Sequence, residues 1–304
     1  MMVQRLSHDF FNLKPTDGVK MIVRPPRAIR SGKEAGFPYS LSRWTDVPVA
    51  KWAWFKEALK EGRMIGFDPS TGVPAHWSLR PDDTLGLVFW TKDPTNLIFE
   101  NPQDRGYKVK VHITVTGWEE VEKGAPSLRA GANTLGMAAS VFKPENVFWR
   151  FSPVPMVTDV VERFDTILAM AAYHGLQRVY LSFLQDNDLM PETRTDQERI
   201  NVLVQIAERA ERRGVRVLLC NEDRFLLGHP ELHPNLGSGV CAPPEDFSMQ
   251  GLQKPPSEGC GCVLMVDPFT INETCTMGCS YCYAADKSLS PKRRNTTQSL
   301  PVVS

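Results

Sequence analysis

Residues 178–220 carry the clearest structural pattern in the chain, and they read RVYLSFLQDNDLMPETRTDQERINVLVQIAERAERRGVRVLLC. Two short runs rich in apolar, β-branched and aromatic residues flank a segment whose apolar residues recur at helical spacing. Thr195 and Glu198 have the spacing of a capping box, which predicts the start of the helix, and Gly214 predicts its end. A strand, a helix and a second strand in this order indicate a parallel βα unit.

The same alternation of strands and helices extends through most of the chain. Apolar stripes that include Trp52 and Phe164 predict two further helices, which end at Gly62 and Gly175. Seven or eight strands over about 230 residues predict a (β/α) barrel, complete or partial. A doubly wound open sheet is the alternative. Strands are predicted at Phe37–Ser42, Leu85–Thr91, Val109–Thr116, Asn146–Phe151, Arg178–Leu184, Val215–Cys220 and Cys262–Val266, with a weaker one at Met64–Phe67.

Composition divides the chain into three parts. Residues 1–30 are polar and spotted with proline, which predicts an irregular N-terminal arm. Residues 31–285 contain the predicted barrel and its C-terminal cysteine loop. Residues 286–304 predict a mobile basic tail, and Gly228–Pro256, rich in Pro and Gly, is predicted to be a long irregular insertion.

Charge and hydropathy limit the possible partners. The charges of the 35 basic and 35 acidic residues cancel, so no overall electrostatic field steers the molecule to nucleic acid or anionic lipid. Binding of nucleic acid by a local basic patch is not excluded by this balance. No signal peptide is recognised, and no apolar run is long enough to span a bilayer. We therefore expect a soluble, cytoplasmic protein. Seven cysteines in a reducing compartment indicate metal ligation or catalysis rather than disulfides.

The sharpest motif is Cys275-Thr-Met-Gly-Cys279-Ser-Tyr-Cys282, a C-x3-C-x2-C spacing. Three thiolates this close in sequence can surround one small cluster, because soft sulfur ligands suit iron–sulfur chemistry. Structural zinc sites usually pair C-x2-C units into four ligands, and ferredoxin loops supply four cysteines per cluster. Three protein ligands on a four-iron cluster leave one iron open.

This motif resembles that of the radical SAM superfamily, C-x3-C-x-aromatic-C, with Tyr281 at the aromatic position. The resemblance implies a [4Fe–4S] cluster on Cys275, Cys279 and Cys282, whose open iron chelates S-adenosylmethionine (SAM). It also implies reductive cleavage of SAM to a 5′-deoxyadenosyl radical, an unidentified substrate, and a reductant such as ferredoxin or flavodoxin. Tyr281 is expected to pack near the adenine of SAM.

The position of the motif in the chain is unusual for that superfamily. The motif usually follows the first barrel strand, whereas here it follows the last predicted strand, Cys262–Val266. In a closed barrel the last strand lies beside the first. We therefore expect a permuted radical SAM barrel in which Cys262–Val266 pairs in parallel with Phe37–Ser42.

A second resemblance covers about residues 40 to 284. The chain resembles the DUF1848 family, whose members end in such a cysteine motif. Each matching piece is short, but all of them occur in the same order. The pieces are Ser42-Arg-Trp-Thr-Asp-Val-Pro48, Val88-Phe-Trp-Thr-Lys-Asp-Pro94, Thr114-Val-Thr-Gly117, Trp149-Arg150, Ser182-Phe183, Cys220-Asn-Glu222 and Cys260-Gly-Cys262-Val263 with Asp267.

The remaining cysteines and the polar strand ends supply further candidates. Cys220, Cys241, Cys260 and Cys262 could assemble a second site, either an auxiliary iron–sulfur cluster or zinc, or Cys220 could be a small buried apolar residue. Arg43, Lys92, Arg150 and Glu222 stand at predicted strand ends, where active sites of parallel α/β folds lie. The cations among them could bind a substrate carboxylate or phosphate, or could form structural ion pairs.

Three functions are consistent with these patterns. The first is a radical SAM enzyme. The second is an iron–sulfur protein for electron transfer or binding, without SAM chemistry. The third is a zinc-stabilised barrel with hydrolytic chemistry, for which the sequence offers no GxSxG, P-loop or HExxH motif.

Overall fold

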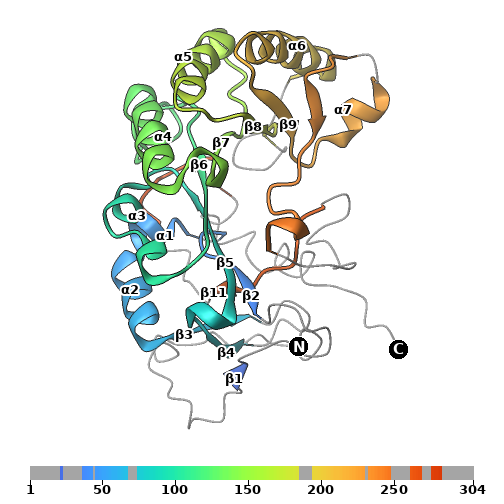
Figure 1. Cartoon of the computed structure of the whole chain (residues 1–304). Coiled ribbons are helices and arrows are strands. Elements are labelled where there is room, and N and C mark those ends of the chain that lie inside the picture. The colour runs from blue at the N-terminus through green and yellow to red at the C-terminus, as the bar shows by residue number, and fades with distance from the viewer. Residues whose placement is uncertain are drawn as a thin grey trace, which may run out of the picture.

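The computed structural model describes residues 21–22, 36–43, 45–67, 74–184, 194–229, 232–247, 261–268 and 275–282. Its main feature is a seven-stranded sheet in which all neighbouring strands are parallel (Figure 1). Six of the predicted strands correspond to members of this sheet, with small differences at their ends. In spatial order the strands are β2 (Phe37–Ser40), β5 (Thr84–Thr91), β6 (Val109–Thr114), β7 (Val147–Phe151), β8 (Arg178–Leu181), β9 (Arg216–Leu219) and β10 (Leu236–Ser238).

The order of the strands decides between the two predicted architectures. From β2 to β10 the strands follow one another in space in the same order as in the sequence. A doubly wound sheet reverses its strand order at a switch point, and this sheet does not. The doubly wound alternative is therefore wrong, and the strands follow one another in the sequential order that βα barrels also have.

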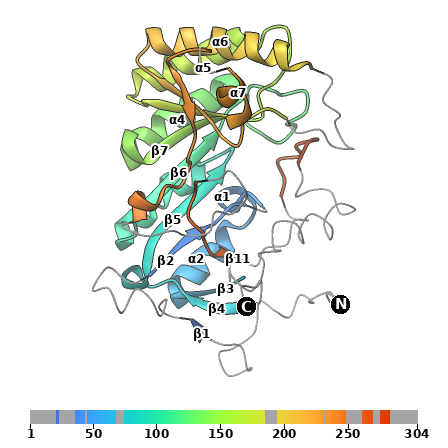
Figure 2. The same ribbon diagram turned by 90° about the vertical axis from the view of Figure 1, so that its right-hand side faces the viewer.

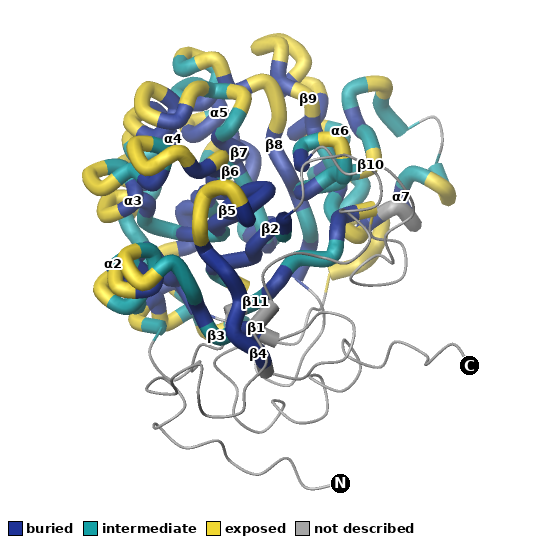
Figure 3. Tube along the Cα trace, turned by 60° about the horizontal axis from the view of Figure 1, so that its bottom comes forward, coloured by how far each residue is buried: buried dark blue, intermediate teal, exposed yellow. Residues whose placement is uncertain are grey.

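Helices cover the outer face of the sheet. The main ones are α4 (Leu128–Phe142), α5 (Val160–Tyr173) and α6 (Asp196–Arg212), which lie along one side in Figure 1. The rings of Trp149 on β7 and Phe164 on α5 stack with their centroids 4.9 Å apart. Figure 3 shows the result, with buried strands inside and exposed helix surfaces outside. The capping box at Thr195 is present and opens α6 as predicted.

The inner face of the sheet carries aromatic and polar side chains. Trp90, His112 and Phe148 occupy paired register positions on β5, β6 and β7. The His112 ring is fully buried and stacks between the other two rings, with centroid distances of 5.4 Å to Trp90 and 4.7 Å to Phe148. Burial and the nearby Arg150 hold the pKa of His112 well below its usual value, so the ring is neutral.

A second, four-stranded sheet lies beside the first. Its strand order is β1 (Met21–Ile22), β4 (Pro74–Ser78), β3 (Arg63–Phe67) and β11 (Asp267–Pro268). The weak strand predicted at Met64–Phe67 therefore exists, but it forms an antiparallel hairpin with β4 rather than a barrel strand. The arm at residues 1–30 was predicted to be irregular, yet it contributes β1, which pairs with β4. The rest of that arm and the predicted basic tail lie outside the described residues.

The segment predicted as an irregular insertion, Gly228–Pro256, contains regular structure. It supplies β10, which extends the main sheet by parallel pairing with β9, and a 3₁₀ turn. That part of the prediction is wrong. The other short elements are α1 (Val47–Ala50), α2 (Trp52–Glu61), α3 (Thr95–Phe99), α7 (Asp223–Gly228) and the 3₁₀ turns Pro81–Asp83, Pro102–Arg105, Pro144–Asn146 and Pro244–Phe247.

The C-terminal segment 261–268 runs beside β2 (Figure 2). Residues Cys262–Val266 do not form the regular strand that was predicted. Val266 nevertheless makes a parallel bridge with Tyr39: its N–H donates to the Pro38 carbonyl, and its carbonyl accepts from the Ser40 N–H, both at 3.0 Å. Upstream in the segment, the Val263 N–H donates to the Ala242 carbonyl at 2.9 Å, just beyond β10. The expected parallel contact with the first strand is thus present as a single bridge.

In the part of the chain that the structure describes, no helix has both the length and the apolar character needed to cross a membrane.

Candidate functional site

The cysteine loop lies against the chain that follows β6. Glu122 and Cys279 form an antiparallel bridge, the Gly124 N–H donates to the Met277 carbonyl at 2.8 Å, and the Ser280 N–H donates to the Val121 carbonyl at 2.9 Å. Residues 116–124, which we call the β6 loop, begin two residues after β6 ends. The loop with Cys275, Cys279 and Cys282 is therefore placed at the carboxyl ends of the parallel strands, where active sites of such folds lie.

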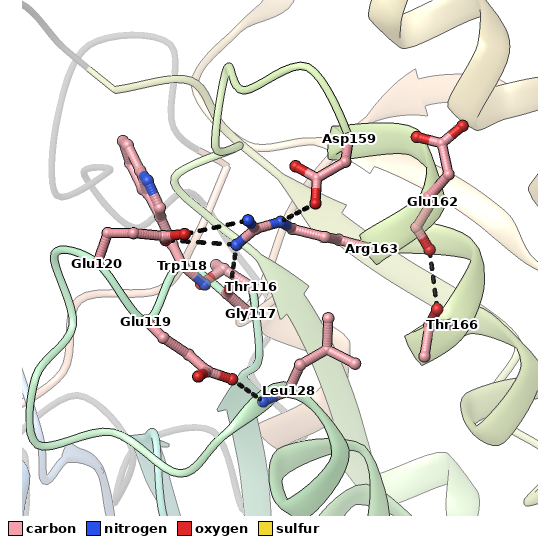
Figure 4. Close-up of polar contacts among 10 residues, drawn as sticks. All are labelled: Thr116, Gly117, Trp118, Glu119, Glu120, Leu128, Asp159, Glu162, Arg163 and Thr166. Carbon is pink, nitrogen blue, oxygen red and sulfur yellow. Dashed lines mark hydrogen bonds and ion pairs between the residues drawn. The ribbon is translucent and has the colours of Figure 1, made fainter.

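Arg163 on α5 fixes the first half of the β6 loop (Figure 4). Its guanidinium donates to the Gly117 carbonyl and forms ion pairs with Glu120 at 3.1 Å and with Asp159 at 2.9 Å. These contacts raise the pKa of Arg163 and lower that of Glu120. On the other side, Glu119 accepts from the Leu128 N–H at the start of α4. The β6 loop is thereby held between two helices.

A buried polar cluster joins the β6 loop to the cysteine loop and to β5. The Glu122 carboxylate accepts hydrogen bonds from the Tyr281 hydroxyl and, at 2.9 Å, from Thr116 Oγ1. It also forms an ion pair with Lys92 Nζ at 2.9 Å. Lys92 and Glu122 are only 11% and 4% exposed. Trp118 stacks on Tyr281 with centroids 5.9 Å apart. Burial and the neighbouring Glu122 carboxylate raise the pKa of Tyr281 well above its usual value, so its hydroxyl keeps the proton that it donates.

The three thiols of the cysteine loop lie near enough to influence one another electrostatically. Burial raises the pKa of Cys279 to about 12; Glu122, Cys282 and Cys275 also raise it, while Lys92 lowers it. The chain reverses at Gly278, whose φ of +59° is in the left-handed region that favours glycine. Within the described ranges, no group of three or more His, Cys, Asp and Glu side chains already has the geometry of a metal site. Thiols can rotate about one bond, so these residues still offer a donor set of the right chemistry for an iron–sulfur cluster.

Asp46 holds the end of β5, which carries Lys92 of the buried polar cluster. Its carboxylate accepts from Thr91 Oγ1 at 2.7 Å and from the Lys92 N–H at 2.8 Å, which fixes the backbone where β5 ends. Burial raises the pKa of Asp46 from 3.8 to about 6, although these hydrogen bonds and the Lys92 charge act in the opposite direction. Asp46 therefore positions the residue that pairs with Glu122.

The second set of predicted cysteines also converges, in a different place. Cys241 Sγ lies 3.3 Å from Cys262 Sγ, and the thiols of Cys220 and Cys241 lie close enough to shift each other's pKa. The buried guanidinium of Arg150 on β7 lies beside the thiols of Cys220 and Cys241, which raise its pKa. The contact with Cys241 and burial both raise the pKa of the Cys220 thiol. The fourth predicted member, Cys260, lies outside the described residues.

The remaining strand-end candidates have separate partners. Arg43 Nη1 pairs with Asp267 Oδ2 at 3.0 Å and links the chain after β2 to β11. Glu222 is buried and accepts from the Phe183 N–H at 3.0 Å, so it holds the chain that follows β8. Of the four predicted catalytic or substrate-binding residues, Lys92 contacts the cysteine-loop cluster and Arg150 contacts the second cysteine set.

The sequence interpretation did not single out Glu122, Trp118 or Asp46 as site residues. Glu122 belongs to the acidic stretch Glu119-Glu-Val-Glu122, which looks like an exposed turn. Its contact with Tyr281 spans 159 residues of sequence, so no local pattern indicates it. Asp46 could have been suspected because it precedes a helix with Pro48 near its start.

A mostly parallel sheet with two groups of clustered cysteines defines a mixed α/β protein of the βα-repeat class. The family model for DUF1848, described as a domain of unknown function, matches residues 39–284, and the chain belongs to this family. No curated protein matches the chain. Among solved structures, a xylose isomerase domain protein from Planctomyces limnophilus is similar at 16% identity and a TM-score of 0.30. That match covers 46% of this chain and 56% of the other, so the chain spans about half of that protein's length.

Proposed function

We propose that this protein is a radical SAM enzyme in which Cys275, Cys279 and Cys282 hold a [4Fe–4S] cluster. The observation that carries the proposal is the docking of the cysteine loop on the β6 loop, at the carboxyl ends of the parallel strands. A motif of three cysteines placed anywhere else on the fold would lie away from the strand ends, where active sites of parallel α/β folds are found.

The residues around the loop fit such a cluster. Three thiols provide the soft donors that iron–sulfur clusters require and leave one iron for the amino and carboxylate groups of SAM. When bound, the cluster would supply the electron that cleaves the sulfonium of SAM. The Lys92 ammonium lies near Cys279 and would offset part of the negative charge of the thiolates.

The aromatic pair beside the loop suits the adenine of SAM. Trp118 and Tyr281 stack on each other next to Cys279 and Cys282, and the Tyr281 hydroxyl is fixed by Glu122. A flat, partly buried ring whose polar end is already satisfied presents an apolar face for stacking. Tyr281 would thus orient SAM, while Lys92 and Glu122 would hold the loop that carries the thiols.

The C-terminal segment supports a permuted barrel. Val266 pairs with β2, and Val263 is hydrogen-bonded to the chain beyond β10, so the segment contacts both ends of the strand order. In a permuted barrel this segment would take the place of the closing strand. The cysteine loop would then follow the last strand and reach the mouth of that barrel from the C-terminal side.

Anaerobic reconstitution with iron and sulfide, followed by dithionite and SAM, tests the proposal. We expect release of 5′-deoxyadenosine, whereas methylthioadenosine would indicate cleavage on the aminocarboxypropyl side. Each of C275A, C279A and C282A should lose cluster and turnover, because iron requires the thiolate ligands. A chain that ends after Lys287 keeps all seven cysteines and serves as the matched control.

A reconstituted and reduced cluster that shows no change in its electron paramagnetic resonance spectrum with SAM, and releases neither product, contradicts the proposal. The chain would then be an electron-transfer or binding protein with an iron–sulfur cluster.

A further inference from the structure

Three thiols from segments far apart in sequence meet on the inner side of the sheet. Cys220 follows β9, Cys241 follows β10, and Cys262 belongs to the C-terminal segment. Cys241 Sγ lies 3.3 Å from Cys262 Sγ, and the thiol of Cys220 lies near enough to Cys241 for the two to shift each other's pKa. The Ala242 N–H also points at Cys262 Sγ, at 3.4 Å. Three segments therefore bring their cysteines to one point.

A buried cation lies against this group. Arg150 reaches the thiols of Cys220 and Cys241, and its Nη1 atom is buried without a hydrogen-bond partner in the described part of the chain. A guanidinium group stays charged at every pH that proteins encounter. A buried charge costs several kcal/mol unless an opposite charge pairs with it, and a neutral thiol supplies none. Two of the three thiols, those of Cys220 and Cys241, thus lie beside a buried positive charge.

The surroundings of Cys262 argue against a purely apolar role for the three thiols. On one side Cys262 packs in a small core with Val88, Ala242, Phe247 and Val263, which is where a cysteine acting as an apolar residue would belong. Such packing gives no reason for a buried guanidinium group beside Cys220 and Cys241. A disulfide between Cys241 and Cys262 would likewise leave Cys220 and Arg150 without a role.

We propose that Cys220, Cys241 and Cys262 bind a thiolate-ligated metal centre, zinc or an iron–sulfur cluster, whose negative charge pairs with Arg150. Three thiolates on one metal ion or cluster give the centre a net negative charge, which the buried guanidinium compensates. Sulfurs that share a tetrahedral metal lie about 3.8 Å apart, given metal–sulfur bonds of about 2.3 Å. The thiols must therefore rotate slightly apart from the 3.3 Å contact to enclose the metal.

This centre is independent of the proposed SAM chemistry and is tested without it. The triple variant C275A/C279A/C282A, purified anaerobically as the full chain, lacks the ligands of the main cluster. We expect it to retain zinc at about one per chain, or iron with matching sulfide, by plasma mass spectrometry. X-ray absorption at the metal edge should show sulfur neighbours at about 2.3 Å, and the edge identifies zinc or iron.

Replacing Cys220, Cys241 and Cys262 by alanine in that background should remove this metal. If this variant does not fold, R150M in the same background gives a second test. Met keeps the length and apolar contacts of the side chain but removes the charge, and we expect release of the metal to a chelator to become about tenfold faster.

The proposal is overturned if the triple variant holds no zinc or iron above background, or if its metal has no sulfur neighbours. It is also overturned if mass spectrometry of the anaerobic protein finds Cys241 and Cys262 joined as a disulfide. Loss of SAM turnover alone leaves this result unchanged, so failure of the proposed function and failure of this inference are separable.

Discussion

Lys92 Nζ lies 2.9 Å from Glu122 Oε1, and this ion pair joins the residue after β5 to the loop after β6. Tyr281 donates to the same Glu122 oxygen from the cysteine loop. One buried carboxylate thus connects three segments, and the position of the cysteine loop depends on it.

We predict a large cost for breaking this pair from one side. K92M and E122Q should each lower the free energy of unfolding by about 3 kcal/mol, because each leaves a buried group without its partner. The double variant should cost less than the sum of the two, since neither isolated charge remains. Melting temperatures of the three variants measure this coupling. K60M breaks an exposed pair with Glu57 and should change the melting temperature little. Additive losses in the double variant would contradict the coupling.

Gly124 provides a second test of how the cysteine loop docks. A Cβ atom at Gly124 would collide with the Thr276 carbonyl and would lie 2.9 Å from Met277 Cα, both of them backbone. We therefore expect G124A to push the cysteine loop away from the β6 loop and to reduce reconstituted iron per chain by at least half. The measurement is iron and sulfide analysis after gel filtration.

The matched control for this substitution is G228A, at the end of α7, where a Cβ atom meets nothing within 4 Å. It should bind iron as the unmodified protein does. Equal iron contents in G124A and G228A would show that the cysteine loop does not need the close approach to Gly124.

Much of the main sheet could be predicted because its strands are apolar runs bounded by turn residues. The helix α4 was missed because Gly131 and Gly136 lower its helix propensity. The structure explains both glycines: a Cβ atom at Gly131 would lie 2.8 Å from Val115 Cγ1, and one at Gly136 would collide with the His174 ring. Close packing of α4 on β6 and α5 therefore overrides the local preference.

The candidate site likewise contains residues that the sequence could predict and residues that it could not. Cys275, Cys279 and Cys282 could be proposed as candidate ligands from their spacing alone, because three cysteines in one loop leave a local pattern. The residues that contact this loop could not be predicted from the sequence, since the bridge between Cys279 and Glu122 depends on how the whole sheet curls. Cys241 follows β10, a three-residue strand next to glycine that forms only by pairing with β9. The contact between Cys241 and Cys262 could therefore be recognised only from the three-dimensional structure.

Arg163 should affect the β6 loop more than the overall stability. Its carboxylate partners, Glu120 and Asp159, are more than half exposed, so these ion pairs contribute little, while the bond to the Gly117 carbonyl is worth about 1 kcal/mol. We predict that R163M lowers the melting temperature by only a few degrees. Hydrogen exchange of amides 117–124 should accelerate about tenfold. R209M, which removes the α6 pair with Asp165, is the control and should leave exchange in the β6 loop unchanged.

The pH dependence of stability should reveal Asp46. Its pKa is raised in the folded state, from 3.8 to about 6, because burial disfavours the charged carboxylate. A raised pKa in the folded state stabilises the protein below the unfolded pKa, and this contribution is lost as the pH rises through about 6. A shift of about two units corresponds to about 3 kcal/mol.

We therefore compare the unmodified protein with D46N, which cannot titrate at this position, by urea unfolding at pH 4, 5, 6 and 7. The free energy of unfolding of the unmodified protein, minus that of D46N, should fall by about 2.4 kcal/mol from pH 4 to pH 7, because at pH 4 part of the unfolded-state carboxyl is already ionised. The comparison subtracts the other carboxyl groups, including Glu198, whose pKa is lowered and whose contribution changes in the opposite direction. A difference that stays constant over this range would show that the pKa of Asp46 is the same in the folded and unfolded states, and that its hydrogen bonds to Thr91 and Lys92 balance its burial.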